Sequence, residues 1–120
     1  MTKMRSNNYH SVKLVAPSGG VTKESLIHVS DLIGMVFDDA DEGAKYLLVY
    51  FCEKIMVPKI TGAGSAFGIG ESVYYDDTLQ TVTPIQAAGL WRIGKATEEA
   101  TDDDDEVEIE LEGKLPLVEV

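Results

Sequence analysis

Glu106-Val107-Glu108-Ile109-Glu110-Leu111-Glu112 is a strict alternation of acidic and apolar residues. A period of two places Val107, Ile109 and Leu111 on one face of a β-strand and the glutamates on the other. Such a strand is typical of an antiparallel sheet that packs one face on a core and turns the other face to water. The stretch therefore predicts a β-sheet protein with a strongly acidic outer surface.

The same order of short strand, Gly- or Asp-rich turn and short strand recurs along the chain. Further strands are predicted at residues 12–15, 26–29, 33–37, 46–52, 55–57, 73–76, 80–83 and 90–96. No stretch of ten residues keeps a helical period. The predicted fold is mainly β: a small single-domain antiparallel β-sandwich or barrel with short hairpins and at most one or two helical turns.

The run of residues 46–52 is apolar on both faces of its predicted strand. The face expected to join the core with the strand at 107–111 consists of Leu47, Val49 and Phe51. The opposite face consists of Tyr46, Leu48, Tyr50 and Cys52. Because one small sheet does not easily cover a second apolar face, and Tyr is favoured at interfaces, we expect Tyr46, Leu48 and Tyr50 to form a subunit interface.

Length and composition indicate one globular domain. A chain of 120 residues with 44% hydrophobic and 26% charged residues buries roughly 65% of its unfolded surface. The longest apolar run, residues 46–52, is far too short to span a bilayer. The basic start of the chain has no apolar segment after it, so no signal peptide is expected. The single Cys52 excludes a disulfide within the chain and is expected to be a small buried residue.

Charge is distributed unevenly along the sequence. Residues 1–23 contain Lys3, Arg5, Lys13 and Lys23 and no acid, whereas the whole chain carries a net charge of −11. An acidic body repels phosphate backbones, so the folded part is not expected to bind nucleic acid. The basic N-terminal segment is either a tether for an acidic protein surface or a solvated terminus with incidental charge.

The sequence contains no recognisable catalytic or metal-binding set. The glycine-rich loop at residues 62–68 matches neither the dinucleotide fingerprint nor the phosphate loop, and the acidic run at 102–105 lacks the EF-hand pattern. The neighbouring aspartates at 38–39 and 76–77 lie in predicted turns, where Asp is common. His10 and His28 have no second His or Cys nearby. We therefore expect no enzyme activity, no cofactor and no metal.

Eight short segments in fixed order carry a resemblance to a known family. The segments are Ala16-Pro-Ser-Gly-Gly-Val21, Val29-Ser-Asp-Leu-Ile-Gly34, Asp39-Ala-Asp-Glu-Gly43, Val57-Pro-Lys59, Phe67-Gly-Ile-Gly70, Val73-Tyr-Tyr-Asp76, Ile93-Gly-Lys-Ala96 and Val107-x-Ile-x-Leu-x-Gly113. In this order they resemble the bacteriophage capsid cement, or head decoration, family. Together they span about residue 9 to residue 113. The chain departs from the family pattern at Glu24 and Glu53, where such sequences usually have Gly, and residues 114–120 look like an added tail.

The resemblance implies a non-enzymatic β-rich protein on the outside of an assembled phage head, where it bridges neighbouring major capsid protein subunits. It divides the chain into a flexible N-terminal arm (residues 1–10), a decoration domain (11–113) and a C-terminal tail (114–120). The candidate capsid-docking residues are Lys3, Arg5 and Tyr9. The expected partners are the major capsid protein and further copies of the chain, as a homotrimer or a dimer, without nucleic acid or membrane.

The expected location is the outer capsid surface of the virion, after synthesis in the cytoplasm of the host bacterium. An alternative from a different class is a ligand-binding or adaptor β-barrel domain without catalysis, which needs an apolar cavity with a few convergent polar groups. A hydrolase with a pair of carboxylates is the third possibility, and it needs two acids held at a fixed separation in a cleft.

Overall fold

The computed structural model describes residues 3–112, and within this range it contains eight β-strands and no helix. The strands are β1 (Tyr9–Val15), β2 (Leu26–Val29), β3 (Leu32–Val36), β4 (Lys45–Pro58), β5 (Ser72–Asp76), β6 (Thr81–Thr83), β7 (Trp91–Ala96) and β8 (Glu106–Leu111). The predicted mainly-β fold is confirmed. The predicted C-terminal tail, residues 114–120, lies outside the described residues.

All eight strands belong to one antiparallel sheet that curls into a barrel-like shape. Their order is β2-β3-β4-β8-β7-β5-β6, and β1 pairs with β4 beside this path. A parallel bridge between Lys59 and Val82 joins the end of β4 to β6, and the amide of Ile60 donates to the carbonyl of Val82 at 3.1 Å. This link brings the last strand of the path back to β4 and nearly closes the barrel.

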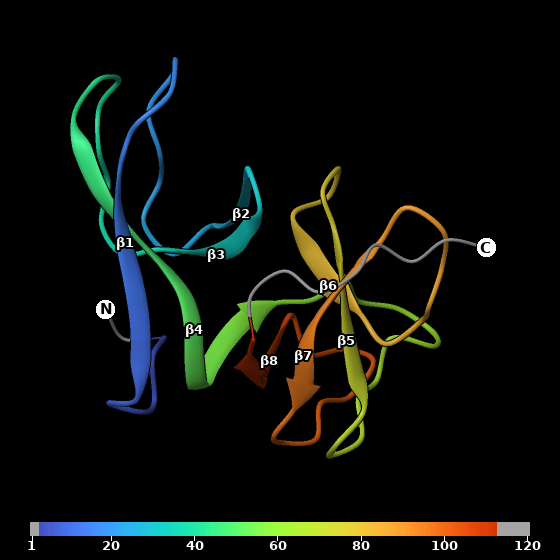
Figure 1. The fold of residues 1–120 in the computed structure, drawn as a ribbon. Helices are drawn as coiled ribbons and strands as arrows, with labels where there is room; N and C mark the ends of the chain where they lie inside the picture. The colour runs from blue at the N-terminus through green and yellow to red at the C-terminus, as the bar shows by residue number, and fades with distance from the viewer. Residues whose placement is uncertain (1–2, 113–120) are drawn as a thin grey trace.

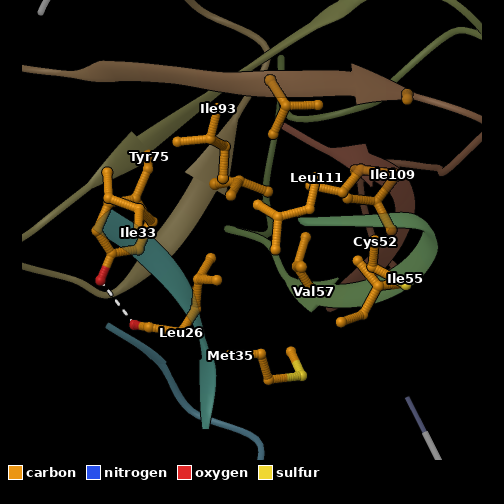
Figure 2. Close-up of a cluster of buried hydrophobic side chains, with 14 of the residues drawn as sticks. Leu26, Ile33, Met35, Cys52, Ile55, Val57, Tyr75, Ile93, Ile109 and Leu111 are labelled. Atoms are coloured by element: carbon orange, nitrogen blue, oxygen red, sulfur yellow. Dashed lines mark hydrogen bonds between the residues drawn. The ribbon is translucent and has the colours of Figure 1, made fainter. Parts of the chain in front are cut away.

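The long strand β4 connects two parts of the molecule. In Figure 1, β1, β2 and β3 gather around the first part of β4, and β5 to β8 gather around its end. We call residues 9–49 the first half and residues 50–112 the second half. The hydroxyl of Tyr75 in β5 donates to the carbonyl of Leu26 in β2 at 2.7 Å, so a buried hydrogen bond joins the two halves (Figure 2).

The predicted core strand β8 is confirmed. Val107, Ile109 and Leu111 are at most 1% exposed and belong to the main core cluster. In Figure 2, Ile109 and Leu111 lie close to residues of β4, among them Ile55 and Val57. The alternation in the sequence therefore assigns the inward face of β8 correctly.

Two irregularities in β4 change which of its side chains face this core. In the pairing with β1, His10 lies opposite Phe51 and Ser11 lies opposite Val49, which leaves Tyr50 as an extra residue. In the pairing with β8, Cys52 lies opposite Leu111 and Ile55 lies opposite Ile109, which again leaves one extra residue in β4. Because each bulge shifts the alternation by one residue, Val49, Cys52, Ile55 and Val57 all join the main cluster.

The prediction that Leu47 and Phe51 share this core is wrong. Leu47 precedes both bulges and keeps the register of Val49, but it lies near the exposed start of β4 and lines a small surface groove instead. Both side chains are half-buried and lie outside the main cluster. Phe51 follows the bulge at Tyr50, so its side chain changes face and contacts the ring of His10 at a centroid distance of 5.1 Å. A strict period of two cannot reveal a bulge, because the extra residue leaves no local signal in this apolar run.

The opposite face of β4 is covered by the chain itself, which corrects the predicted subunit interface. Tyr46 and Leu48 are 5% and 0% exposed and form a second core cluster with Ala16 and Val36. Partly buried apolar residues from β1, β2, β3 and their loops pack against this cluster. Tyr50 is half-buried and stacks on His10. The curled sheet thus supplies the cover that the sequence analysis assigned to a neighbouring subunit.

Candidate docking surfaces

The N-terminal segment, residues 3–8, lies along β4 as an irregular extra strand. The amide of Met56 donates to the carbonyl of Lys3 at 2.9 Å, and the amide of Arg5 donates to the carbonyl of Lys54 at 2.8 Å. Met4 forms a bridge with Ile55 in the same stretch. Main-chain hydrogen bonds therefore attach this segment to the second half. That residues 1–10 act as a flexible arm stays a prediction.

The two cations of the segment pair with acidic side chains of the second half. Lys3 Nζ contacts Glu106 Oε2, and this hydrogen bond is the main reason why the pKa of Lys3 is raised. Arg5 Nη1 lies 3.2 Å from Glu108 Oε2 and 3.5 Å from Glu98 Oε2. The segment lies along β4, and its two cationic side chains therefore link it to the acidic strand β8 on the far side of β4.

Glu108 departs from the prediction that every glutamate of β8 faces water. Its side chain is buried, and Arg5 and the hydroxyl of Thr97 donate to its two carboxylate oxygens. A buried carboxylate needs such partners, because an unpaired charge away from water is costly. The N-terminal segment therefore covers part of the surface that the sequence alone indicates to be open.

Of the three predicted docking residues, the structure brings Lys3 and Arg5 together on the acidic face and places Tyr9 elsewhere. Tyr9 begins β1 and is 40% exposed. A docking contact by Lys3 or Arg5 requires the segment to leave β4 first. Their role in docking stays a prediction.

Lys59 is a structural residue whose role the sequence analysis did not identify. It directly follows β4 and is only 3% exposed. Its Nζ donates to three carbonyl oxygens, those of Ile60 at 2.8 Å, Thr101 at 3.0 Å and Asp104 at 2.7 Å. The ammonium group thereby ties the loop after β4 to the loop before β8. The signal was present in the quoted segment Val57-Pro-Lys59, where a lysine ends an apolar strand.

The acidic run 102–105 forms part of the same junction. Asp102 Oδ1 accepts hydrogen bonds from the amides of Ser65 and Ala66 at 3.1 and 2.9 Å. Asp104 Oδ2 accepts one from the amide of Thr101 at 2.8 Å. These carboxylates are bound to backbone amides, as is typical of Asp in turns.

The other acidic pairs singled out from the sequence are also used in turns. Asp76 Oδ1 accepts from the amides of Thr78 and Leu79 at 2.9 and 3.3 Å. Asp39 Oδ1 accepts from the amide of Lys23 at 2.7 Å. Within residues 3–112 no cluster of three or more His, Cys, Asp or Glu side chains is arranged to hold a metal ion.

The largest groove of the described chain has a volume of about 580 Å³ and lies mainly in the first half. It is lined by the end of β1, the loop that follows, β2, β4 and the β5–β6 turn. The lining residues are Val15, Pro17, Gly20, Val21, Thr22, Ser25, Ile27, His28, Val29, Ser30, Tyr46 and Gln80. None of them is Asp or Glu, although the chain has 21 such residues. We call this feature the uncharged groove.

Exposed apolar side chains lie at two borders of the uncharged groove. Val15, which lines it, is 61% exposed, and Leu79, which precedes the lining residue Gln80, is 60% exposed. Inside the groove, His28 Nδ1 lies 3.2 Å from the carboxylate of Asp77, so β2 and the β5–β6 turn hold each other. The groove therefore offers an uncharged surface of mixed polar and apolar side chains, and both halves support it.

The acidic charge is concentrated in the second half. Residues 9–49 contain three Lys or Arg and six Asp or Glu, whereas residues 50–112 contain four and fourteen. A smaller groove of about 260 Å³ in the second half has six carboxylates among its eight lining residues. The two halves thus present different chemistry to a partner: the first has an uncharged groove lining and few acids, and the second is strongly acidic.

A small β-domain whose turn carboxylates are bound to its own backbone, and whose largest groove is uncharged, has the features of a structural or binding protein. A family model described as phage cement protein matches residues 6–111. The chain therefore belongs to the phage cement protein family, as the eight segments indicated. The family is structural rather than catalytic, and membership gives the chain a capsid-associated role in a bacteriophage virion.

The remaining comparisons add no further relative. Comparison with curated proteins and with solved structures gave no match. Among residues 3–112, no helix is long and apolar enough to cross a membrane.

Proposed function

We propose that this protein binds the outer surface of an assembled phage head and stabilises the shell by bridging neighbouring major capsid protein subunits. The single observation that supports this most strongly is the uncharged groove in a chain of net charge −11. Docking through an uncharged surface avoids the cost of removing water from carboxylates. We infer that the groove side of the first half contacts the capsid.

The acidic second half then points away from the shell. Strong negative charge on the solvent side keeps decorated particles soluble and prevents them from adhering to one another. Binding at many equivalent positions lets individually weak contacts add up over the shell. This arrangement is consistent with a location on the outer capsid surface and with a partner that is protein rather than nucleic acid.

The N-terminal segment gives a second route to the same partner. If residues 3–8 leave β4 on the capsid, Lys3, Arg5 and Tyr9 become available to an acidic capsid surface, and the segment's main chain becomes free to pair with a capsid strand. The self-partner also stays a prediction. A homotrimer was expected on the face of Tyr46, Leu48 and Tyr50, and burial of that face removes the residues on which the expectation depended.

A change of charge in the uncharged groove tests the proposal. Thr22 and Gln80 are exposed lining residues, so Thr22→Glu combined with Gln80→Glu adds two charges without disturbing the core. Since these carboxylates lose water on docking, we expect binding to heads that lack the protein to weaken at least tenfold, about 1.4 kcal/mol. Co-sedimentation with such heads measures the binding.

Gln86→Glu is the matched control, because Gln86 is exposed and lies outside the groove lining. It should sediment with heads as the unchanged protein does. Equal binding by the double variant and by the control would contradict docking through the groove. Failure of the unchanged protein to sediment with heads would overturn the proposed function itself.

The same groove also supports the alternative function, a ligand-binding or adaptor barrel. A volume of about 580 Å³ lies within the usual size range of small-molecule sites. The sedimentation experiment also separates this alternative, because a ligand-binding domain has no reason to sediment with empty heads.

A further inference from the structure

Strand β1 has one free edge in the described structure. Among residues 3–112 it pairs only with β4, and Figure 1 shows it at the margin of the first half. It is seven residues long, five of its side chains are exposed, and it contains no proline and one charge, Lys13. A long free edge with so little protection is a ready site for pairing with another strand.

The hydrogen bonds at the end of β1 show which backbone groups are available. The amide of Ala16 donates to the carbonyl of Ala44 at 2.8 Å, and the carbonyl of Ala16 accepts from the amide of Gly43 at 3.0 Å. Since backbone groups alternate in direction along a strand, Leu14 and Val12 also point to β4. The N–H and C=O groups of Ser11, Lys13 and Val15 therefore point outward.

We propose that this edge pairs with the same edge of a second copy, antiparallel and centred on Val12. In this register Tyr9 of each copy lies opposite Val15 of the other, and Ser11 lies opposite Lys13. The strand is thus complementary to itself across a two-fold axis, as an isologous interface requires. The inference concerns the free protein and does not depend on the proposed binding to the capsid.

The register follows from the direction of the backbone groups and from the charge of Lys13. The outward N–H and C=O groups of the two copies face each other only when the two-fold axis passes through a residue. An axis through Ser11, Val12 or Lys13 pairs at least five residues of β1, and an axis through any other residue of β1 pairs three or fewer. Centring on Lys13 places two ammonium groups opposite each other, which is unfavourable. Centring on Ser11 leaves Val15 beyond the end of the partner strand. Centring on Val12 pairs all seven residues.

The same register covers exposed apolar surface. Tyr9 and Val15 are two of the five large apolar side chains that the described structure leaves exposed, at 40% and 61%. On the other face of the strand, Val12 meets Val12 and continues the second core cluster from one copy to the next. A single strand pair buries little area, so we expect a dimer that forms reversibly as protein concentration rises.

Single cysteines at three neighbouring positions test both the pairing and its register. In the proposed register Val12 faces itself across the axis at a Cα separation of about 4.5 Å, which permits a disulfide. Ser11 and Lys13 lie about 8 Å from their own counterparts, which is too far. Under mild oxidation of the free protein, Val12→Cys should give mainly covalent dimers, whereas Ser11→Cys and Lys13→Cys should stay monomeric. The native Cys52 is buried, and the unchanged protein therefore measures the background of disulfide formation.

A second pair of variants separates strand pairing from apolar adhesion. Val15→Glu, introduced into the Val12→Cys protein, should reduce its covalent dimer at least fivefold, because it places a carboxylate against Tyr9 of the partner. Leu79→Glu is the matched control: Leu79 is 60% exposed, against 61% for Val15, and it lies outside β1. It should leave the dimer yield unchanged.

Several outcomes would overturn the proposal. The first is a Val12→Cys protein that cross-links no more than the other two cysteine variants. The second is a Ser11→Cys or Lys13→Cys protein that forms mainly covalent dimers. The third is an equal loss of covalent dimer with Val15→Glu and with Leu79→Glu. Cross-linking of Val12→Cys to capsid protein on heads, without dimers in the free protein, would also overturn it and would assign the edge to a capsid strand.

Discussion

Replacing Lys59 with Met is expected to lower the free energy of unfolding by about 3 kcal/mol, roughly 1 kcal/mol for each carbonyl left without its donor. The buried ammonium group satisfies three carbonyl oxygens, two of them in the loop of residues 101–104. Methionine fills a similar volume but donates no hydrogen bond, so three partly buried carbonyls lose their donor. Since a domain of this size is stable by only about 5–15 kcal/mol, the change removes a large part of the total.

Urea unfolding followed by tryptophan fluorescence measures this loss, because the only tryptophan of the chain, Trp91, packs against the main core. Lys54→Met is the matched control: Lys54 also belongs to β4, and its side chain is exposed. Its substitution should shift stability by less than about 0.5 kcal/mol. Equal midpoints for the two variants would show that the Lys59 hydrogen bonds do not hold the two loops.

Replacing Gly94 with Ala is expected to lower the free energy of unfolding by about 3 kcal/mol. Gly94 lies in β7 opposite Leu111 of β8. A Cβ on Gly94 would lie 1.9 Å from the carbonyl oxygen of Glu110. The obstacle is backbone, which cannot rotate aside, so β7 and β8 must separate where they form the barrel wall.

Gly68→Ala is the control for this change. The nearest atom to a Cβ on Gly68 is a carboxylate oxygen of Glu71 at 2.9 Å, the movable end of a side chain. Gly68→Ala should lower the free energy of unfolding by only about 1 kcal/mol, because it displaces the hydrogen bond between that carboxylate and the Gly68 amide. Amide exchange in β7 and β8 should quicken only in Gly94→Ala. Full protection there would contradict the close packing of these strands.

The fold could be predicted from the sequence where one residue pattern dominates. The alternation from 106 to 112 identified β8 and its buried face because acid and apolar residues differ so strongly there. The run from 46 to 52 gave the strand but not the direction of its side chains. Every position of that run is apolar or aromatic, so the bulge at Tyr50 leaves no mark on the pattern.

The candidate site was harder to predict, because it depends on which distant segments meet. Lys3 and Arg5 were recognised as an unusual pair of cations, but their partners Glu106 and Glu108 are more than a hundred residues away. The uncharged groove draws residues from β1, β2, β4 and the β5–β6 turn. No local pattern links such positions. The burial of Lys59 became visible only with the loop that surrounds it.

A stabilising role on the capsid is tested most directly by heating DNA-filled phage heads that lack this protein, with and without the purified protein added. Release of DNA, followed by a dye that cannot enter intact heads, reports when the shell fails. If the protein bridges capsid subunits, heads saturated with it should release their DNA at a clearly higher temperature than bare heads, and the groove variant should give less protection at equal concentration. Saturated heads that release DNA at the same temperature as bare heads would contradict a stabilising role on the capsid.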